Sequence, residues 1–407
     1  MAATRKGAPG SGVAANRKGK PDDVADGPLV VRWTESGEAR SARWRSESGA
    51  PPPERVVVAD DRMTADEAYG LACQGTALLW RGDFNNARQM LVALRSRSYR
   101  QPHKRKQRAA AAAPAEAFHL HRQAQAQRAR TLGMLLVPVE ADYGIALRRA
   151  PDLRQACTEA WGAGGVASVA SLRELLGIVG AHEWRTEGIE IPAIGGRIHP
   201  HYGVFSPIRR EYVDLVDKAP LPEAVSTHSV AFDIGTGTGV LAALLARRGI
   251  EKVIATDQDP RAFNCAMGNI ARLKLAKQVQ VAQAEFFPEG RAALVVCNPP
   301  WVPARPSSPL ERGIYDPESR MLKGFLAGLP AHLDPGGEGW LILSDLAEHL
   351  GLRTRQDLLD LIEAAGLRVV DRLDTRPKHP KVADDADPLH AARAAEVTSL
   401  WRLAVKS

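Results

Sequence analysis

The stretch FDIGTGTGVLAALL (232–245) contains three glycines at alternate positions, Gly235, Gly237 and Gly239. An apolar run precedes these glycines, and a segment with helical apolar spacing follows them. Glycine allows the chain to turn sharply between a strand and a helix. Without a Cβ, it also lets a ligand lie directly against the backbone. The pattern, with Thr236 between the first two glycines, predicts a loop that holds a nucleotide-like cofactor. A purely structural turn is the alternative.

Two carboxylates refine the identity of that cofactor. Asp257 ends the next predicted strand, where an acidic side chain can accept hydrogen bonds from both ribose hydroxyls. Asp233 stands at the strand end directly before the glycines, where its charge would repel a diphosphate but suit an ammonium group. The third glycine also comes one residue earlier than in the dinucleotide pattern. The sequence therefore predicts S-adenosylmethionine rather than a dinucleotide.

A second motif, ALVVCNPPWVP, follows the fourth predicted strand of this part of the chain. The two prolines, Pro299 and Pro300, fix the backbone, so that the side-chain oxygen of Asn298 and nearby carbonyls become rigid hydrogen-bond acceptors. Trp301 adds a flat aromatic face. Such a site would hold a planar NH₂ group and align it for methyl transfer by positioning rather than by a strong base.

The C-terminal half alternates strands and helices, which predicts an α/β fold with a doubly wound, mostly parallel sheet. Several strands are continuously apolar, as strands covered on both faces must be. Asp259 followed by Pro260 marks the start of a helix, and Thr354 and Gly366 bound another. The predicted strands are 229–233, 253–257, 279–283, 293–297, 340–344, 367–373 and 397–406.

Residues 200–407 resemble class I S-adenosylmethionine-dependent methyltransferases of the "methyltransferase small" type, close to the HemK-like glutamine methyltransferases. The resemblance rests on the loop 233–239, the acidic Asp257 and the motif 298–301. It implies a seven-stranded Rossmann-like methyltransferase sheet whose last strand, 397–406, runs antiparallel. HemK-like enzymes usually have tyrosine where this chain has Trp301.

The resemblance also implies three further cofactor contacts. Glu285, after the third strand, takes the place of the acidic residue that contacts the adenine amine, although Asp is commoner there. Phe205 and Pro207 lie in a segment similar to the one that closes over the cofactor before the glycine loop.

The N-terminal half predicts a different organisation. Residues 1–55 are expected to form a disordered basic tail and linker, residues 56–185 a smaller, mainly helical accessory or substrate-recognition domain, and residues 186–407 the methyltransferase domain. Thr64 and Asp83 are expected to cap helices. Within the accessory domain, a basic insertion is expected over 95–115.

That insertion accounts for the whole excess of positive charge. The segment Arg95 to Arg108 has seven Arg or Lys residues and no acid, in a chain of net charge +7. It predicts contact with RNA or a ribosome, or else a solvated loop. No apolar run is long enough for a membrane span. The four cysteines are widely spaced, which favours reduced thiols and a cytoplasmic location. The histidine pairs 119/121 and 199/201 lack further ligands, so we expect no metal.

The function that these features predict is N-methylation of a planar NH₂ group in a macromolecule, with a protein glutamine amide favoured slightly over an adenine or guanine amine. A base would have to be extruded or single-stranded to reach such a pocket. A non-catalytic adaptor that binds S-adenosylmethionine and docks on RNA or ribosomes is the alternative from another class.

Overall fold

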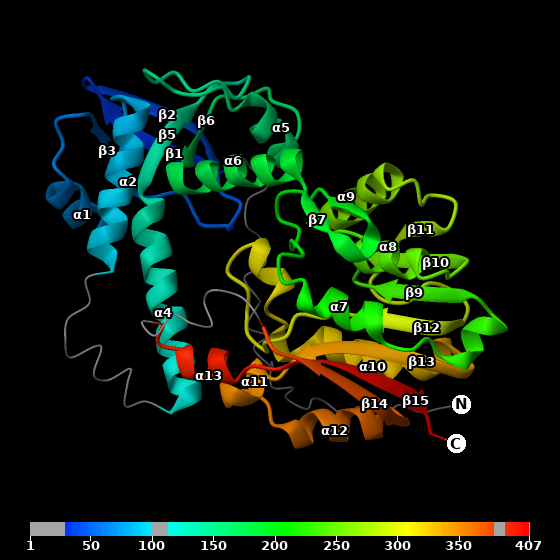
Figure 1. Cartoon of the computed structure of the whole chain (residues 1–407). Coiled ribbons are helices and arrows are strands. Elements are labelled where there is room, and N and C mark those ends of the chain that lie inside the picture. The colour runs from blue at the N-terminus through cyan, green and yellow to red at the C-terminus, as the bar shows by residue number, and fades with distance from the viewer. Residues whose placement is uncertain (1–28, 100–112, 378–386, 407) are drawn as a thin grey trace, which may run out of the picture.

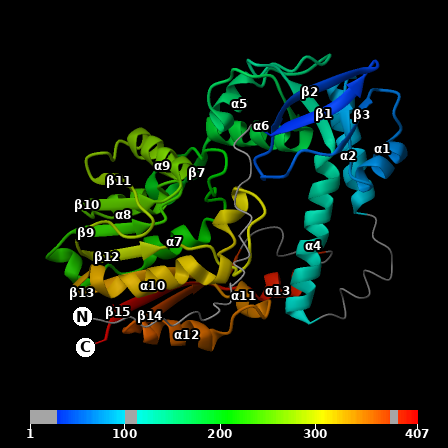
Figure 2. The same cartoon turned by 180° about the vertical axis from the view of Figure 1, so that it is seen from behind.

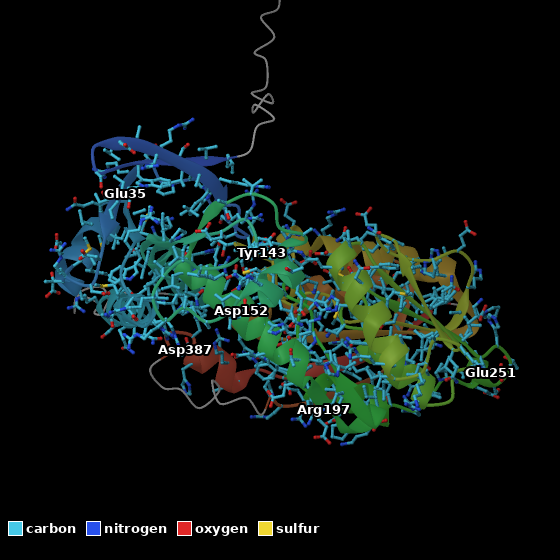
Figure 3. The ribbon with its side chains drawn as sticks, turned by 90° about the horizontal axis from the view of Figure 1, so that it is seen from above. Glu35, Tyr143, Asp152, Arg197, Glu251 and Asp387 are labelled. Carbon is cyan, nitrogen blue, oxygen red and sulfur yellow. The ribbon has the colours of Figure 1, made fainter. Side chains whose placement is uncertain are left out.

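A computed structural model describes residues 29–99, 113–377 and 387–406, which form two lobes, each built on its own β-sheet (Figure 1). Seen from above, Glu35 marks the far end of the N-terminal lobe and Glu251 the opposite end of the C-terminal lobe (Figure 3). A two-stranded hairpin lies between the two main sheets in the chain.

The N-terminal lobe is a mixed α/β unit: residues 56–185 contain more helix than strand, but the prediction of a mainly helical domain missed the sheet that the helices accompany. Its sheet has the order β1-β2-β6-β5-β4-β3. Two of its strands lie within 1–55, so the prediction of a disordered segment is also wrong for its later part. The strands are β1 (Val30–Glu35), β2 (Glu38–Arg45), β3 (Arg55–Ala59), β4 (Thr76–Trp80), β5 (Leu135–Val139) and β6 (Ser168–Ser171).

Five helices accompany this sheet in the described chain: α1 (Ala65–Cys73), α2 (Phe84–Ser98), α4 (Pro114–Gly133), α5 (Arg154–Trp161) and α6 (Leu172–Glu187). The two predicted caps are confirmed: the Thr64 side chain accepts a hydrogen bond from the Glu67 amide, and Asp83 accepts one from Asn85. Most of the basic insertion, from 100 to 112, lies outside the described residues.

A short hairpin leads into the C-terminal lobe, close to the predicted boundary at 185. It consists of β7 (Ile189–Ile191), the 3₁₀ turn η1 (Pro192–Ile194) and β8 (Gly196–Ile198). Gly195 occupies the left-handed region at φ 60°, which lets the chain reverse between the two strands.

The C-terminal sheet has seven strands in the order β11-β10-β9-β12-β13-β15-β14. β9 pairs in parallel with both β10 and β12, and β15 runs antiparallel to β13 and β14. The α/β class predicted from the sequence is therefore confirmed. The strands are β9 (Val230–Ile234), β10 (Lys252–Asp257), β11 (Val279–Gln283), β12 (Ala292–Cys297), β13 (Leu333–Ser344), β14 (Leu367–Thr375) and β15 (Thr398–Val405).

Helices cover both faces of this sheet. α8 (Val240–Arg247) packs in the apolar cluster on one face, and α10 (Arg320–His332) and α12 (Arg355–Ala364) in the cluster on the other. Asp259 caps α9, and Thr354 forms a full capping box, as predicted. The remaining elements are α7 (Glu211–Lys218), η2 (Glu223–Ser226), α9 (Pro260–Arg272), η3 (Leu310–Gly313), η4 (Pro317–Ser319), α11 (Leu346–His349) and α13 (His390–Ala395).

The long helix α4 belongs to the N-terminal half of the chain but reaches the other lobe. Figures 1 and 2 both show it descending from the first sheet to α11 and α13. Ala117 and Phe118 of α4 share one buried cluster with Val302, Leu350 and Leu389. The N-terminal lobe therefore packs directly against the segment that follows Trp301.

Candidate functional site

The glycine loop lies where the sequence predicts it, between β9 and α8. Gly235, Gly237 and Gly239 all have positive φ, at 70°, 57° and 81°. A Cβ on Gly239 would lie 3.3 Å from Ala266 of α9, whereas a Cβ on Gly237 would meet no atom within 4 Å. Gly239 therefore allows close helix packing, and Gly237 turns bare backbone toward open space, as a cofactor cradle requires.

Asp233 is buried beneath this loop rather than exposed above it. Its Oδ2 accepts hydrogen bonds from Thr236 Oγ1 at 2.6 Å and from the Ala242 amide at 2.9 Å. Burial raises the pKa of this carboxyl to about 6, and the hydrogen bonds from Thr236 and Ala242 oppose the rise. Through these two hydrogen bonds, Asp233 connects the glycine loop to the first turn of α8.

Asp257 stands at the end of β10 next to the loop, and it is partly exposed. Its Oδ2 accepts from the Gly237 amide and its Oδ1 from the Asp259 amide, both at 3.0 Å. Each carboxylate oxygen can accept a second hydrogen bond, so a ribose diol can still be bound. Burial raises the pKa of Asp257, while the backbone hydrogen bonds lower it.

Asn298 and Trp301 are joined directly. The indole Nε1 of Trp301 donates a hydrogen bond of 2.9 Å to Asn298 Oδ1, at the carboxyl end of β12. The sequence did not predict this contact, although the spacing of three residues around two prolines permits it. Asn298 Oδ1 is thereby held in one orientation, with its second lone pair available to a substrate.

The segment before α7 wraps around this motif. The guanidinium of Arg209 lies over the Trp301 ring, 5.7 Å from its centroid, and so covers one face of the indole. Phe205 packs so closely on Gly313 that a Cβ there would lie 2.7 Å from the Phe205 Cβ. Pro207 is buried. Phe205 and Pro207 thus belong to a packed wall beside the motif.

Glu285 lies further out. It follows β11, is exposed, and forms an ion pair with Arg320 at the start of α10. This pairing crosses from the third strand to the helix before β13. The carboxylate that we expected at the adenine amine is therefore already partnered in the structure.

Helix α4 braces the segment that carries the motif. Phe118 packs against Tyr315, with ring centroids 6.4 Å apart, and the Arg122 guanidinium lies 4.1 Å from the centre of the same ring. Arg122 also donates to Glu311 at 2.9 Å. Val302, the residue after Trp301, forms a β-bridge with Tyr315. The sequence could not predict these contacts of α4, because they join residues that are 189 or more positions apart in the chain.

Several predicted features lie apart from this site. In the described residues, Arg97 of the basic segment is paired with Asp66, and no group of three metal-binding side chains is found. The described part of the chain also contains no helix long and apolar enough to cross a membrane. All four cysteines, which lie within the described ranges, are unpaired, and three are buried.

The strand order, the glycine loop on β9, the acidic end of β10 and the motif after β12 define a class I S-adenosylmethionine-dependent methyltransferase domain. Residues 219–299 match the family model described as ribosomal protein L11 methyltransferase, PrmA. The class and its cofactor, S-adenosylmethionine, are therefore confirmed.

Individual relatives agree with this match. A ribosomal protein L11 methyltransferase of Pelotomaculum thermopropionicum is 45% identical over 155 residues, which cover 37% of this chain and 42% of the relative. One from Vibrio cholerae is 34% identical over 102 residues, covering 25% and 35%. The chain thus spans less than half the length of these curated relatives.

Among solved structures, the ribosomal protein L11 methylase of Lactobacillus delbrueckii subsp. bulgaricus is similar, with 16% identity and a TM-score of 0.31. That comparison covers 44% of this chain and 70% of the other.

Proposed function

We propose that the protein transfers a methyl group from S-adenosylmethionine to a neutral, planar NH₂ group of a protein, with a glutamine side-chain amide as the acceptor. The observation that carries this proposal is the fixed Asn298 Oδ1, which the Trp301 indole orients at the carboxyl end of β12. This position lies one strand away from the glycine loop of β9.

Bound S-adenosylmethionine supplies an electrophilic methyl group. The residues of the chain would hold the acceptor nitrogen: Asn298 Oδ1 accepts one of its hydrogens, and a carbonyl of the same rigid turn accepts the other. These two contacts strengthen as positive charge develops on the nitrogen. An amide oxygen is neutral and a poor base, so the arrangement suits an NH₂ group that needs no prior deprotonation and that loses one proton to water once the new N–C bond has formed.

A protein substrate is favoured over a nucleic-acid base. The matched relatives are named as methyltransferases of ribosomal protein L11, and the motif order resembles HemK-like enzymes, which also modify protein. A ribosomal protein or a protein bound at the ribosome is therefore the class of partner we propose. The unpaired cysteines fit a cytoplasmic location, which belongs to the same proposal.

The test uses the full chain, methyl-labelled S-adenosylmethionine and an extract from cells that lack the protein. We expect label that is released by protease and located by mass spectrometry on a glutamine amide. Label released by nuclease would contradict the proposal and favour a base amine. Label on a protein amine would retain the protein substrate but overturn the amide.

The same reaction with Asn298→Ala is the matched control, and we expect it to give little label at unchanged cofactor affinity. No label with the unaltered chain, although cofactor binds, would favour the adaptor.

A further inference from the structure

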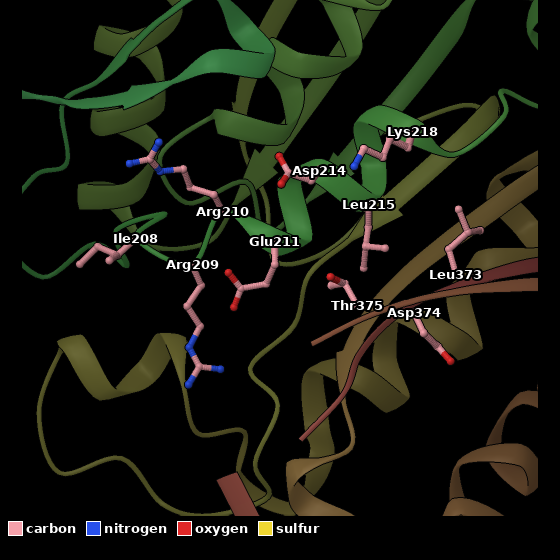
Figure 4. Close-up of a pocket in the computed structure, with 10 residues that line it drawn as sticks. All are labelled: Ile208, Arg209, Arg210, Glu211, Asp214, Leu215, Lys218, Leu373, Asp374 and Thr375. Carbon is pink, nitrogen blue, oxygen red and sulfur yellow. The ribbon is translucent and has the colours of Figure 1, made fainter. Parts of the chain in front are cut away.

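A pocket that the proposed reaction does not use lies beside Arg209, the residue that covers Trp301. It has a volume of about 830 Å³ and lies between the start of α7 and the end of β14; its lining includes Arg209, Glu211, Leu215 and Thr375 (Figure 4). In the sheet, β12, β13 and β15 separate β14 from β9, the strand that precedes the glycine loop. Arg209 links the pocket to Trp301, because its guanidinium covers the indole.

Glu211 is the unusual residue of this pocket. Glu211 is only 9% exposed, and its buried Oε1 has no hydrogen-bond partner among the residues that the structure describes. Figure 4 shows Glu211 and Arg209 extending to the same side, whereas Asp214 and Arg210 point the other way. A buried carboxylate oxygen without a donor is costly, so this arrangement calls for a ligand that donates.

The neighbouring cation does not satisfy Glu211. Arg209 donates to Glu396 Oε1 at 2.8 Å, and Ser344 donates to the same oxygen at 2.7 Å. Asp374, the residue before Thr375, also lines the pocket. Its carboxylate accepts hydrogen bonds from Arg372 at 2.8 Å and from Ser399 at 2.7 Å. Arg209 and Asp374 are thus paired with other residues, and none of the described hydrogen bonds reaches Glu211 Oε1.

Two more buried oxygens without partners, in the described chain, lie at this edge of the sheet: Glu396 Oε2 and Thr398 Oγ1. Glu396 is bound by Arg209, and Thr398 is the register partner of Thr375 in the β14–β15 pair. Glu396 and Thr398 lie next to the pocket lining, and two carboxylate oxygens in this region, Glu211 Oε1 and Glu396 Oε2, thus lack a donor among the described residues. A guanidinium group has five N–H donors and no acceptor, and it matches these oxygens better than a neutral group does.

We propose that this pocket is a subsite for a positively charged side chain, arginine above all, that flanks the methylated residue of the protein substrate, with Glu211 as its anion. The inference rests on the proposed function only in taking the ligand to be part of a protein. Arg209 then lies between the two sites, with its guanidinium on Trp301 and its charge compensated by Glu396.

The test measures binding of small probes to the full chain by titration calorimetry, without turnover. We expect acetyl-arginine amide to bind at least about tenfold more tightly than the neutral acetyl-citrulline amide, which has nearly the same shape. Glu211→Gln should abolish this preference, whereas Asp217→Asn, at an exposed carboxylate of the same helix outside the pocket lining, should retain it. Affinity for S-adenosylmethionine should be unchanged in both variants.

A second variant tests the subsite if the Glu211→Gln protein does not fold. Thr375→Arg should place a guanidinium of the chain itself in the pocket and prevent acetyl-arginine amide from binding. Equal affinities for the two probes, no binding of either, or an unchanged preference in Glu211→Gln would overturn the subsite. Because label transfer is measured separately, arginine binding without methylation would refute only the proposed function, and methylation without arginine binding only the subsite.

Discussion

The bond between Trp301 and Asn298 leads to a prediction that distinguishes a positioning role from simple stacking. Trp301→Phe removes the indole N–H that donates to Asn298 Oδ1 at 2.9 Å and keeps an aromatic ring in the same place. A hydrogen bond of this kind contributes about 0.5–1.5 kcal/mol. If the bond serves mainly to hold Asn298 for the transition state, kcat should fall roughly 3–10-fold while cofactor affinity stays constant.

The assay is a double-mutant cycle on labelled methyl transfer. Asn298→Ala alone should reduce kcat by about 10²–10³-fold, because it removes an acceptor used as charge develops. Adding Trp301→Phe to Asn298→Ala should then cost little more, since the indole acts through the amide. Trp184→Phe, at a residue of α6 that is 49% exposed, is the control for a general effect of losing an indole.

Two results would refute this reasoning. Independent, multiplicative effects of the two substitutions would mean that Trp301 contacts the substrate itself, as the sequence suggested when we assigned it a flat face for stacking. Full activity of Asn298→Ala would remove the amide from the mechanism altogether.

Three further predictions concern the cofactor loop and the basic segment. Asp257→Ala should weaken S-adenosylmethionine binding by about 10–100-fold in calorimetry, because the carboxylate also holds the Gly237 amide; an unchanged affinity would exclude it from the site. The raised pKa of Asp233, about 6, means that stability should fall by about 3 kcal/mol as the pH rises from about 4 to above 6, since the folded state binds the proton more tightly. Denaturation of Asp233→Asn should lack this component, and identical pH profiles would contradict it. Serine at the Arg and Lys positions of 100–108 should weaken binding to ribosomal particles and reduce its salt dependence, and an unchanged salt slope would mark the segment as a solvated loop.

The sequence predicted the C-terminal lobe well because its strands are covered on both faces. Strands such as β12, all of whose residues are buried, are continuously apolar, and glycines or caps separate them from the helices. The glycine loop and the acidic end of β10 are likewise local features. Their spacing in the chain fixes their place at one edge of a parallel sheet.

The N-terminal lobe was mispredicted for equally physical reasons. The helix that Thr64 caps is short, because Gly75 at φ 78° follows the end of α1 and lets the buried strand β4 begin at Thr76. β2 is largely exposed and charged, so its sequence resembles a linker more than a strand. Short strands beside helices lack the alternation on which a prediction depends.

Contacts that join the lobes explain why the candidate site needs more than its own motif. Trp301 belongs to apolar clusters on both faces of the sheet and also to the cluster around Phe118, so it lies where three packed units meet. Helix α4 holds Tyr315 through Phe118 and Arg122, and Tyr315 is bridged to Val302. The position of the indole, and through it the orientation of Asn298, is therefore set partly by the N-terminal lobe. A substitution that loosens α4 at Phe118 should therefore disturb the packing of Val302, the residue next to Trp301.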